Sequence, residues 1–136
     1  MVGRIDPSHD DRDSNYIYII GSDRFSTDLH KLNELANKES ANLNLDYRYN
    51  DKTDSNKFYE RSDNYNFAKR GVPIIFYFNG VHEDYHMPSD RSEKILYPLL
   101  LRRTQLIYWT GWKIATAPKR PAVDIDANFT TPLPTP

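Results

Sequence analysis

Cysteine is absent from the 136 residues of this chain, which excludes disulfide bonds, thiolate zinc sites and cysteine nucleophiles. An excess of charge is absent too, because 18 basic and 19 acidic residues are interleaved and give a formal net charge of -1. No basic patch follows the chain, so nucleic acid is not an expected partner. Long apolar runs and the features of a signal peptide are also missing, which predicts no membrane partner and no targeting segment at residues 1–6.

Aromatic residues, in contrast, are abundant. They make up 13% of the chain and include ten tyrosines, although the mean hydropathy is only -0.77. This combination predicts a small core with apolar surface left over for a partner.

The apolar pattern of the first half predicts a βαβ unit. Residues 16–20 are a β-branched and aromatic run that ends at Gly21, as is typical of a central strand buried on both faces. Apolar residues then recur at helical spacing and predict a helix that Ser26 or Thr27 caps and that ends near residue 39. Residues 43–47 alternate apolar and polar side chains, which predicts a second strand nearer an edge.

The second half predicts a long loop, one apolar strand and a final helix. Residues 49–64 are polar without a period and predict the loop. After a helical turn at 65–70, residues 72–78 predict a strand whose following loop, 80–92, takes the position where open parallel sheets bind ligands. Residues 97–116 predict a helix that covers one face of the sheet. Its apolar stripe is expected to contain Leu100, Ile107, Gly111 and Ile114. Residues 1–117 are thus expected to form a domain portion, and residues 118–136 an extended or disordered proline-containing tail.

The loop at 80–92 contains the pattern His-Glu-x-x-His, from His82 to His86, which on a helix is the zinc site of zincin metalloproteases. Gly80 before it and Pro88 after it leave room for about one helical turn, which argues against a helix. In a second interpretation His86 alone points from a loop into a pocket, and Asp90 accepts from its second ring nitrogen or caps the turn. Residue types alone also allow both histidines to be surface or hydrogen-bonded loop residues.

A longer pattern of residues resembles a known family. It includes Arg61-Ser62-Asp63-Asn64, then Gly71-Val72-Pro73, and the segment 82–90 with His86, Pro88 and Asp90 in the order His-x-Pro-x-Asp. Further matching stretches are residues 1–6, 20–23, 76–80 and 120–124. In this order and spacing the chain closely resembles the C-terminal part of family twenty-eight of the metallopeptidases, the bacterial leucyl-type zinc aminopeptidases and their relatives.

The resemblance implies an α/β fold: a partial three-layer sandwich of the zinc-exopeptidase type, with a mostly parallel sheet, flanking helices and the N-terminal part of the fold missing. It also implies two zinc ions held by two histidines, a bridging aspartate and two further carboxylates, with a separate glutamate as general base. Of these groups only the last histidine lies in this chain, at His86 rather than His82. One carboxylate ligand directly precedes the position that matches Met1, and the other groups lie further upstream.

Three more residues take their expected roles from the resemblance. Tyr85 is a candidate hydrogen-bond donor to the tetrahedral intermediate, or an aromatic residue that packs the loop. Asp63 is expected to accept hydrogen bonds that order its loop and support the site. Asn64 stands where many relatives have histidine, and an amide does not titrate, so proton transfer at this position is not expected.

Because one imidazole falls short of the three or four protein ligands of zinc sites, the chain alone is expected to hold no zinc stably and to be inactive. The first hypothesis is therefore a fragment of a zinc aminopeptidase that acts on peptide substrate only when its missing half completes it. The alternative is a non-catalytic binding or self-assembling module that uses residues 49–64. A homo-oligomer through an uncovered strand or apolar surface is expected. Relatives are commonly exported, which suggests a periplasmic or secreted protein.

Overall fold

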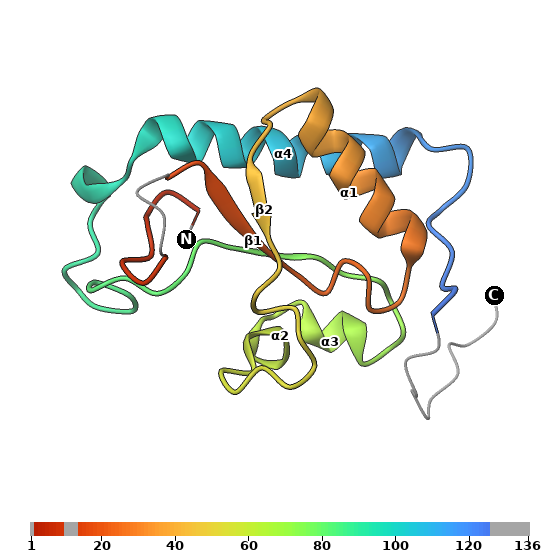
Figure 1. Ribbon diagram of the computed structural model, residues 1–136, viewed down its shortest axis with the longest axis horizontal. Helices are drawn as coiled ribbons and strands as arrows, with labels where there is room; N and C mark the ends of the chain where they lie inside the picture. The colour runs from red at the N-terminus through yellow and green to blue at the C-terminus, as the bar shows by residue number, and fades with distance from the viewer. Residues whose placement is uncertain (1, 10–13, 126–136) are drawn as a thin grey trace.

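The computed structural model describes residues 2–9 and 14–125, which are arranged around a mixed three-stranded sheet in the order β2-β1-β3 (Figure 1). Strand β1 (Tyr16–Ile20) pairs in parallel with β2 (Asn44–Asp46) and antiparallel with β3 (Phe76–Phe78). The fold is α/β as expected, but among the described strands the sheet is not mostly parallel. The predicted central strand, its parallel neighbour at the edge and the connecting helix are confirmed.

Strand β1 is fully buried because both faces of the sheet are covered. Alternate side chains of a strand point to opposite faces, so its even-numbered and odd-numbered residues enter two different clusters. Tyr16, Tyr18 and Ile20 join the first cluster, and Ile17 and Ile19 join the second. The first cluster also contains Phe25, Phe58, Tyr59, Ala68, Ile74 and Phe78, and the second contains Ala36, Ala41, Leu43 and Leu106. β1 is paired on both sides, so it is not an uncovered strand, and the expected homo-oligomer stays a prediction.

Two long helices cover the face of the sheet that carries the second cluster (Figure 1). Helix α1 (Thr27–Glu39) begins where the Ser26 hydroxyl accepts from the Leu29 amide, and α4 (Tyr97–Thr116) has proline in its first turn. Their buried faces are more polar than the leucine pattern predicts. Asn33 of α1 is buried because it accepts from the Tyr77 hydroxyl at 2.6 Å, whereas Leu35 is exposed. Gly111, predicted on the buried stripe of α4, is exposed.

Two one-turn helices, α2 (Phe58–Arg61) and α3 (Tyr65–Ala68), lie on the other side of the sheet (Figure 1). The predicted turn at 65–70 is therefore confirmed, but the predicted loop at 49–64 contains a helical turn. Helix α2 is formed because Phe58 and Tyr59 bury their rings in the first cluster. A short 3-10 helix, η1 (Ser92–Lys94), precedes α4. Within residues 2–9 and 14–125, no helix is long and apolar enough to cross a membrane.

The segment 2–9 packs largely against the rest of the protein. Asp6 and His9 are buried, and the His9 ring stacks on Tyr16 with 3.6 Å between ring centroids. The Asp6 carboxylate accepts from the Ser8 amide and from the Tyr18 hydroxyl. Burial of this polar segment is possible because its groups are hydrogen-bonded to the sheet.

The segment 118–125, predicted as part of an extended or disordered tail, is extended and crosses the start of α1. The Asp124 carboxylate accepts from the Thr27 amide at 2.8 Å and from its hydroxyl, and the Asp124 amide donates to Phe25. These hydrogen bonds lower the pKa of Asp124. Negative charge is favourable at a helix N-terminus, which explains where this segment binds. The rest of the predicted tail, 126–136, lies outside the described residues.

Candidate functional site

The histidine loop follows β3, and the direction of this strand decides where the loop lies. Because β3 is antiparallel to β1, the end of β3 at Phe78 lies opposite Tyr18 and near the beginning of β1. The Tyr16 hydroxyl donates to the Asn79 carbonyl at 2.9 Å, which places the loop at that edge of the sheet. The prediction that this loop lies past the carboxyl ends of parallel strands is therefore wrong. The loop lies against residues 2–9 instead.

Arg4 connects the two segments. Its guanidinium donates to Asp84 at 2.7 Å and to Asp90 at 2.5 Å. On the other side of Asp84, the Lys94 ammonium donates to the second carboxylate oxygen at 2.7 Å. The hydrogen bond from Arg4, with those from Lys94 and Ser89, holds the pKa of Asp84 well below its usual range. The Asp84 carboxylate is thus ionised and fully engaged by two cations.

His82 is the buried histidine of the loop, with 7% of its surface exposed. Its Nε2 lies 3.9 Å from Asp90, and its Nδ1 is buried with no partner within residues 2–9 and 14–125. Burial lowers the pKa of His82 from its ordinary value, which favours the neutral imidazole at neutral pH.

His86 has the opposite environment. It is exposed, and its backbone φ of 59° lies in the left-handed region. Its ring stacks on Tyr85 with 4.0 Å between centroids, and Tyr85 packs edge-on against Phe78. Non-glycine residues with positive φ cost free energy and gather at functional sites. His86 shares this conformation with Asn42 and Lys57 among the described residues.

The backbone of the loop rejects the zincin interpretation. Residues 82–90 form successive turns, with amide-to-carbonyl hydrogen bonds from Tyr85 to His82 and from Met87 to Asp84, and contain no helix. A zincin needs both histidines on one face of a helix, whereas here His82 is buried and His86 is exposed.

Three side chains of this region, His82, Asp84 and Asp90, lie close enough together to suggest a metal site, with one ligand atom of each within 4.8 Å of the others. Their donor atoms do not fit one, because Arg4 and Lys94 already occupy the carboxylates and would repel a dication. His86 is not part of this group. Its imidazole accepts no hydrogen bond and forms no ion pair with the residues that the structure describes, so His86 is the accessible imidazole of this loop.

The roles predicted for the remaining site residues, Asp63, Asn64 and Asp90, stay predictions. The Asp90 carboxylate lies at Arg4 and His82, not at the imidazole of His86 for which it was predicted. Asp63 is exposed, and its carbonyl accepts from the Asn66 amide at 3.3 Å. Asn64 donates its side-chain amide to the Ile75 carbonyl, so it fastens the turn to the strand region.

Arg103 of α4 is the residue of this region that sequence reasoning missed. Its side chain is completely buried and donates to the carbonyls of Tyr16, Val2, Arg4 and Ser14. Desolvation lowers the pKa of Arg103, but no carboxylate of the described residues is paired with it. A signal was present, because Arg103 interrupts the predicted apolar stripe between Leu100 and Ile107. Arg103 fixes the segment 2–4 against the sheet and so positions Arg4.

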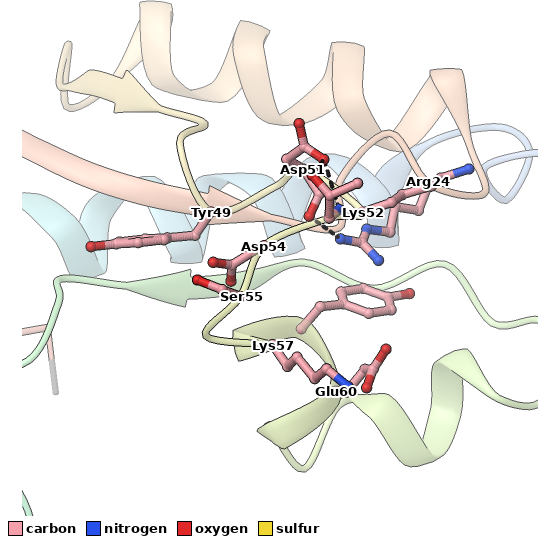
Figure 2. Close-up of a pocket in the computed structure, with 10 residues that line it drawn as sticks. Arg24, Tyr49, Asp51, Lys52, Asp54, Ser55, Lys57 and Glu60 are labelled. Carbon is pink, nitrogen blue, oxygen red and sulfur yellow. Dashed lines mark hydrogen bonds between the residues drawn. The ribbon is translucent and has the colours of Figure 1, made fainter.

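A separate pocket of about 210 Å³ lies at the opposite edge, past the carboxyl ends of β1 and β2 (Figure 2). Its lining comes from Arg24, Tyr49, residues 51–55, Lys57, Tyr59 and Glu60. The Arg24 guanidinium lies 3.9 Å over the Tyr59 ring and donates to the carbonyls of Asn50 and Asp51. The Asp51 carboxylate is used within its own turn, by the amide and hydroxyl of Thr53.

Comparison with known proteins gives one family. The family model described as Peptidase family M28 matches residues 11–110, which include both strands of the βαβ unit and the complete histidine loop. Neither a curated protein nor a solved structure matches the chain.

Proposed function

Because the chain belongs to peptidase family M28, we propose that it forms the His86-bearing part of a zinc-dependent aminopeptidase site that hydrolyses N-terminal residues from peptides. The family match supports the assignment to the hydrolases and, more narrowly, to the peptidases. The family is generally zinc-dependent, which supports zinc as the metal. Aminopeptidase specificity is our inference from the resemblance in the segments 61–64 and 82–90.

One observation carries the proposal: the loop with His86 is bound to the segment that begins at Val2, by the ion pairs of Arg4 with Asp84 and Asp90 and by hydrogen bonds of residues on either side of the loop. The Leu96 amide donates to the Gly3 carbonyl at 2.9 Å, and the Asn79 side chain donates to the Arg4 carbonyl at 2.7 Å. The resemblance implies a carboxylate ligand directly before the position of Met1. An imidazole and a carboxylate from these two segments would then reach a common metal, as zinc sites require.

The chain's own residues would act by positioning. Tyr85 holds the His86 ring by stacking, and the turns on either side hold its strained backbone. Arg4 fixes the position of the loop relative to the segment 2–4 by its hydrogen bonds to Asp84 and Asp90. When bound, zinc would supply a Lewis acid for the scissile carbonyl. Because the described residues offer a single ligand, no reaction step is assigned to them.

The test compares the 136-residue chain alone and mixed with the separately produced N-terminal half of an M28 relative. Zinc uptake is measured by equilibrium dialysis, and activity is measured with an aminoacyl-anilide substrate. We expect no activity from the chain alone and zinc-dependent activity from the mixture.

His86→Ala and His82→Ala form a matched pair within one loop. We expect His86→Ala to abolish zinc-dependent activity of the mixture and His82→Ala to retain it after correction for folded protein. Activity of the chain alone, or equal losses in the two variants, would contradict the proposed ligand.

The pocket at residues 49–60 favours a second candidate function, a non-catalytic binding module for small anions. The positive groups that line it, Arg24, Lys52 and Lys57, form no ion pair with any carboxylate in the described part of the chain. Asp54 resembles Asp51 in using its carboxylate within its own turn, where it accepts from Asn56 and Phe58. Glu60 is the one lining carboxylate without such a role. Three cations and three carboxylates thus line the pocket, but the Asp51 and Asp54 carboxylates are engaged within their own turns, whereas the ammonium groups of Lys52 and Lys57 have no partner among the described residues and are left to bind an anion.

Titration with N-acetylglutamate, followed by amide chemical shifts, tests this candidate. Saturable shifts in residues 50–60 that Arg24→Gln removes and the exposed control Arg70→Gln preserves would support it. Unchanged shifts at millimolar ligand would exclude it.

A further inference from the structure

The outward face of α4 is aromatic and apolar. Tyr97, Leu101, Tyr108, Trp109 and Trp112 are between 42% and 60% exposed. At 100° per residue, all except Trp109 fall with Thr104 and Gln105 on one stripe, opposite the buried residues Arg103, Leu106 and Thr110. The rings touch one another along it, with 6.4 Å between the centroids of Tyr108 and Trp112.

No charged side chain interrupts this stripe. Helix α4 contains three charged residues, and each of them is directed toward the rest of the domain. Arg103 is buried, Arg102 donates to the Ala41 carbonyl at 2.7 Å, and Lys113 pairs with Glu39 at 2.5 Å. An uncharged aromatic surface of this kind is typical of a protein interface, where aromatic residues are enriched and charges depleted.

The residues of the stripe are spaced symmetrically about its middle, although their types differ. Leu101 lies three residues before Thr104, and Tyr108 lies three residues after Gln105. Tyr97 and Trp112 stand seven residues before Thr104 and seven after Gln105. An antiparallel copy of the helix would therefore place Leu101 against Tyr108, and Tyr97 against Trp112, on both sides of a two-fold axis between Thr104 and Gln105.

We propose that this face of α4 binds a second copy of the chain in an antiparallel, two-fold symmetric dimer. Symmetric dimers require a self-complementary patch, and this stripe is one, because its symmetric spacing places apolar and aromatic side chains against one another. Side chains of this size bury ~150–250 Å² when covered, so the four half-exposed ones on the stripe offer roughly 450 Å² per copy. Thr104 and Gln105 between them and Trp109 at the edge enlarge the patch toward the ~800 Å² per partner of a standard interface.

Site-specific cross-linking tests the geometry, because the chain has no native cysteine. Gln105→Cys places one thiol per chain next to the two-fold axis. With helix axes about 8–10 Å apart, facing residues come within disulfide range. We expect oxidation to convert Gln105→Cys to a covalent dimer, while Lys38→Cys, on the exposed surface of α1, stays monomeric. Equal cross-linking of the two variants would overturn the proposal.

Charge substitutions test the register by sedimentation velocity. Leu101→Glu puts an unpaired carboxylate against Tyr108 and should weaken the dimer at least about tenfold, as should Tyr108→Lys. The double variant Leu101→Glu/Tyr108→Lys creates two crossed ion pairs only if the helices are antiparallel. We expect it to recover dimerisation relative to each single variant, and circular dichroism checks that all three are folded. No recovery in a folded double variant would contradict the antiparallel register.

The alternative occupant of such a face is a lipid surface. A wild-type chain that stays monomeric at 100 µM, or one that is monomeric and sediments with phosphatidylcholine vesicles, would overturn the dimer. A concentration-dependent dimer that does not sediment with the vesicles supports it. The dimer is independent of the proposed peptidase function, because Arg103, which positions Arg4, lies on the buried face of α4 and the outward face carries none of the site residues.

Discussion

Arg4 and Asp84 are 80 positions apart in the chain, and a hydrogen-bonded ion pair of 2.7 Å joins them. This pair fastens the histidine loop to the segment 2–4, with Asp90 as the second carboxylate on the same guanidinium. Both Arg4 and Asp84 are shielded from water, with side chains 13% and 5% exposed. The pair therefore stabilises the relation between two segments that local sequence does not connect.

Because of Asp84, the free energy of unfolding should decrease at acidic pH. Its pKa is depressed in the folded protein by Arg4, Lys94 and Ser89, so the folded state binds this proton less readily than the unfolded state. The contribution of Asp84 to the free energy of unfolding is complete at pH values above its ordinary pKa of 3.8. This contribution is lost as the pH falls below 3.8. Asp84→Asn should lower the unfolding midpoint in urea at pH 7, and its difference from wild type should shrink toward pH 3. Asp63→Asn, at an exposed carboxylate, is the control, and a constant difference for Asp84→Asn across this range would contradict the assignment.

Arg103→Met should destabilise the protein by about 3–5 kcal/mol, because it leaves four carbonyls without their buried donor. Arg102→Met is a matched control on the same helix. Arg102 donates a single hydrogen bond, to Ala41, so we expect a loss of about 1 kcal/mol. Urea unfolding followed by tryptophan fluorescence measures both variants. Equal losses would show that the four carbonyl contacts of Arg103 add nothing to stability.

Substitution of the two loop histidines should affect the stability of the protein differently. His86→Gly relieves the left-handed backbone at φ 59° and should leave the protein as stable or more stable by up to about 1 kcal/mol. His82→Ala removes a buried ring and should cost about 1–3 kcal/mol. Thermal unfolding at pH 7 distinguishes the two variants. A clear loss of stability in His86→Gly would mean that its ring packs the fold rather than serves a site.

Alanine substitution should lower the stability of the protein at Gly21 and raise it at Gly111. Gly21 has a φ of 90°, and a Cβ there would lie 2.5 Å from the Tyr59 ring, so Gly21→Ala should cost about 2 kcal/mol or more. Gly111 lies within α4 with no atom in 4 Å of an added Cβ, so Gly111→Ala should stabilise by about 0.5–1 kcal/mol. Chemical denaturation at low protein concentration measures both. A stabilising Gly21→Ala would refute the close approach of Tyr59.

The elements of this fold followed from local patterns in the sequence. The run at 16–20 predicted a strand buried on both faces, and the cap at Ser26 and the spacing after it predicted α1. Such patterns are readable because the side-chain period of a strand or helix is set by its own backbone. The family could also be predicted from the sequence, because the chain itself contains the motifs at the segments 61–64 and 82–90 in their order.

Tertiary structure alone decided the direction of β3, and with it the place of the histidine loop. A seven-residue apolar run looks the same in parallel and antiparallel pairing, so the sequence did not distinguish the two edges of the sheet. It also decided that Arg103 is buried and that Asp84 and Asp90 face Arg4 rather than a metal, because the partners come from segments far apart in sequence. Local residue types determine which elements form, whereas long-range hydrogen bonds and charge pairs determine which side chains they bring together.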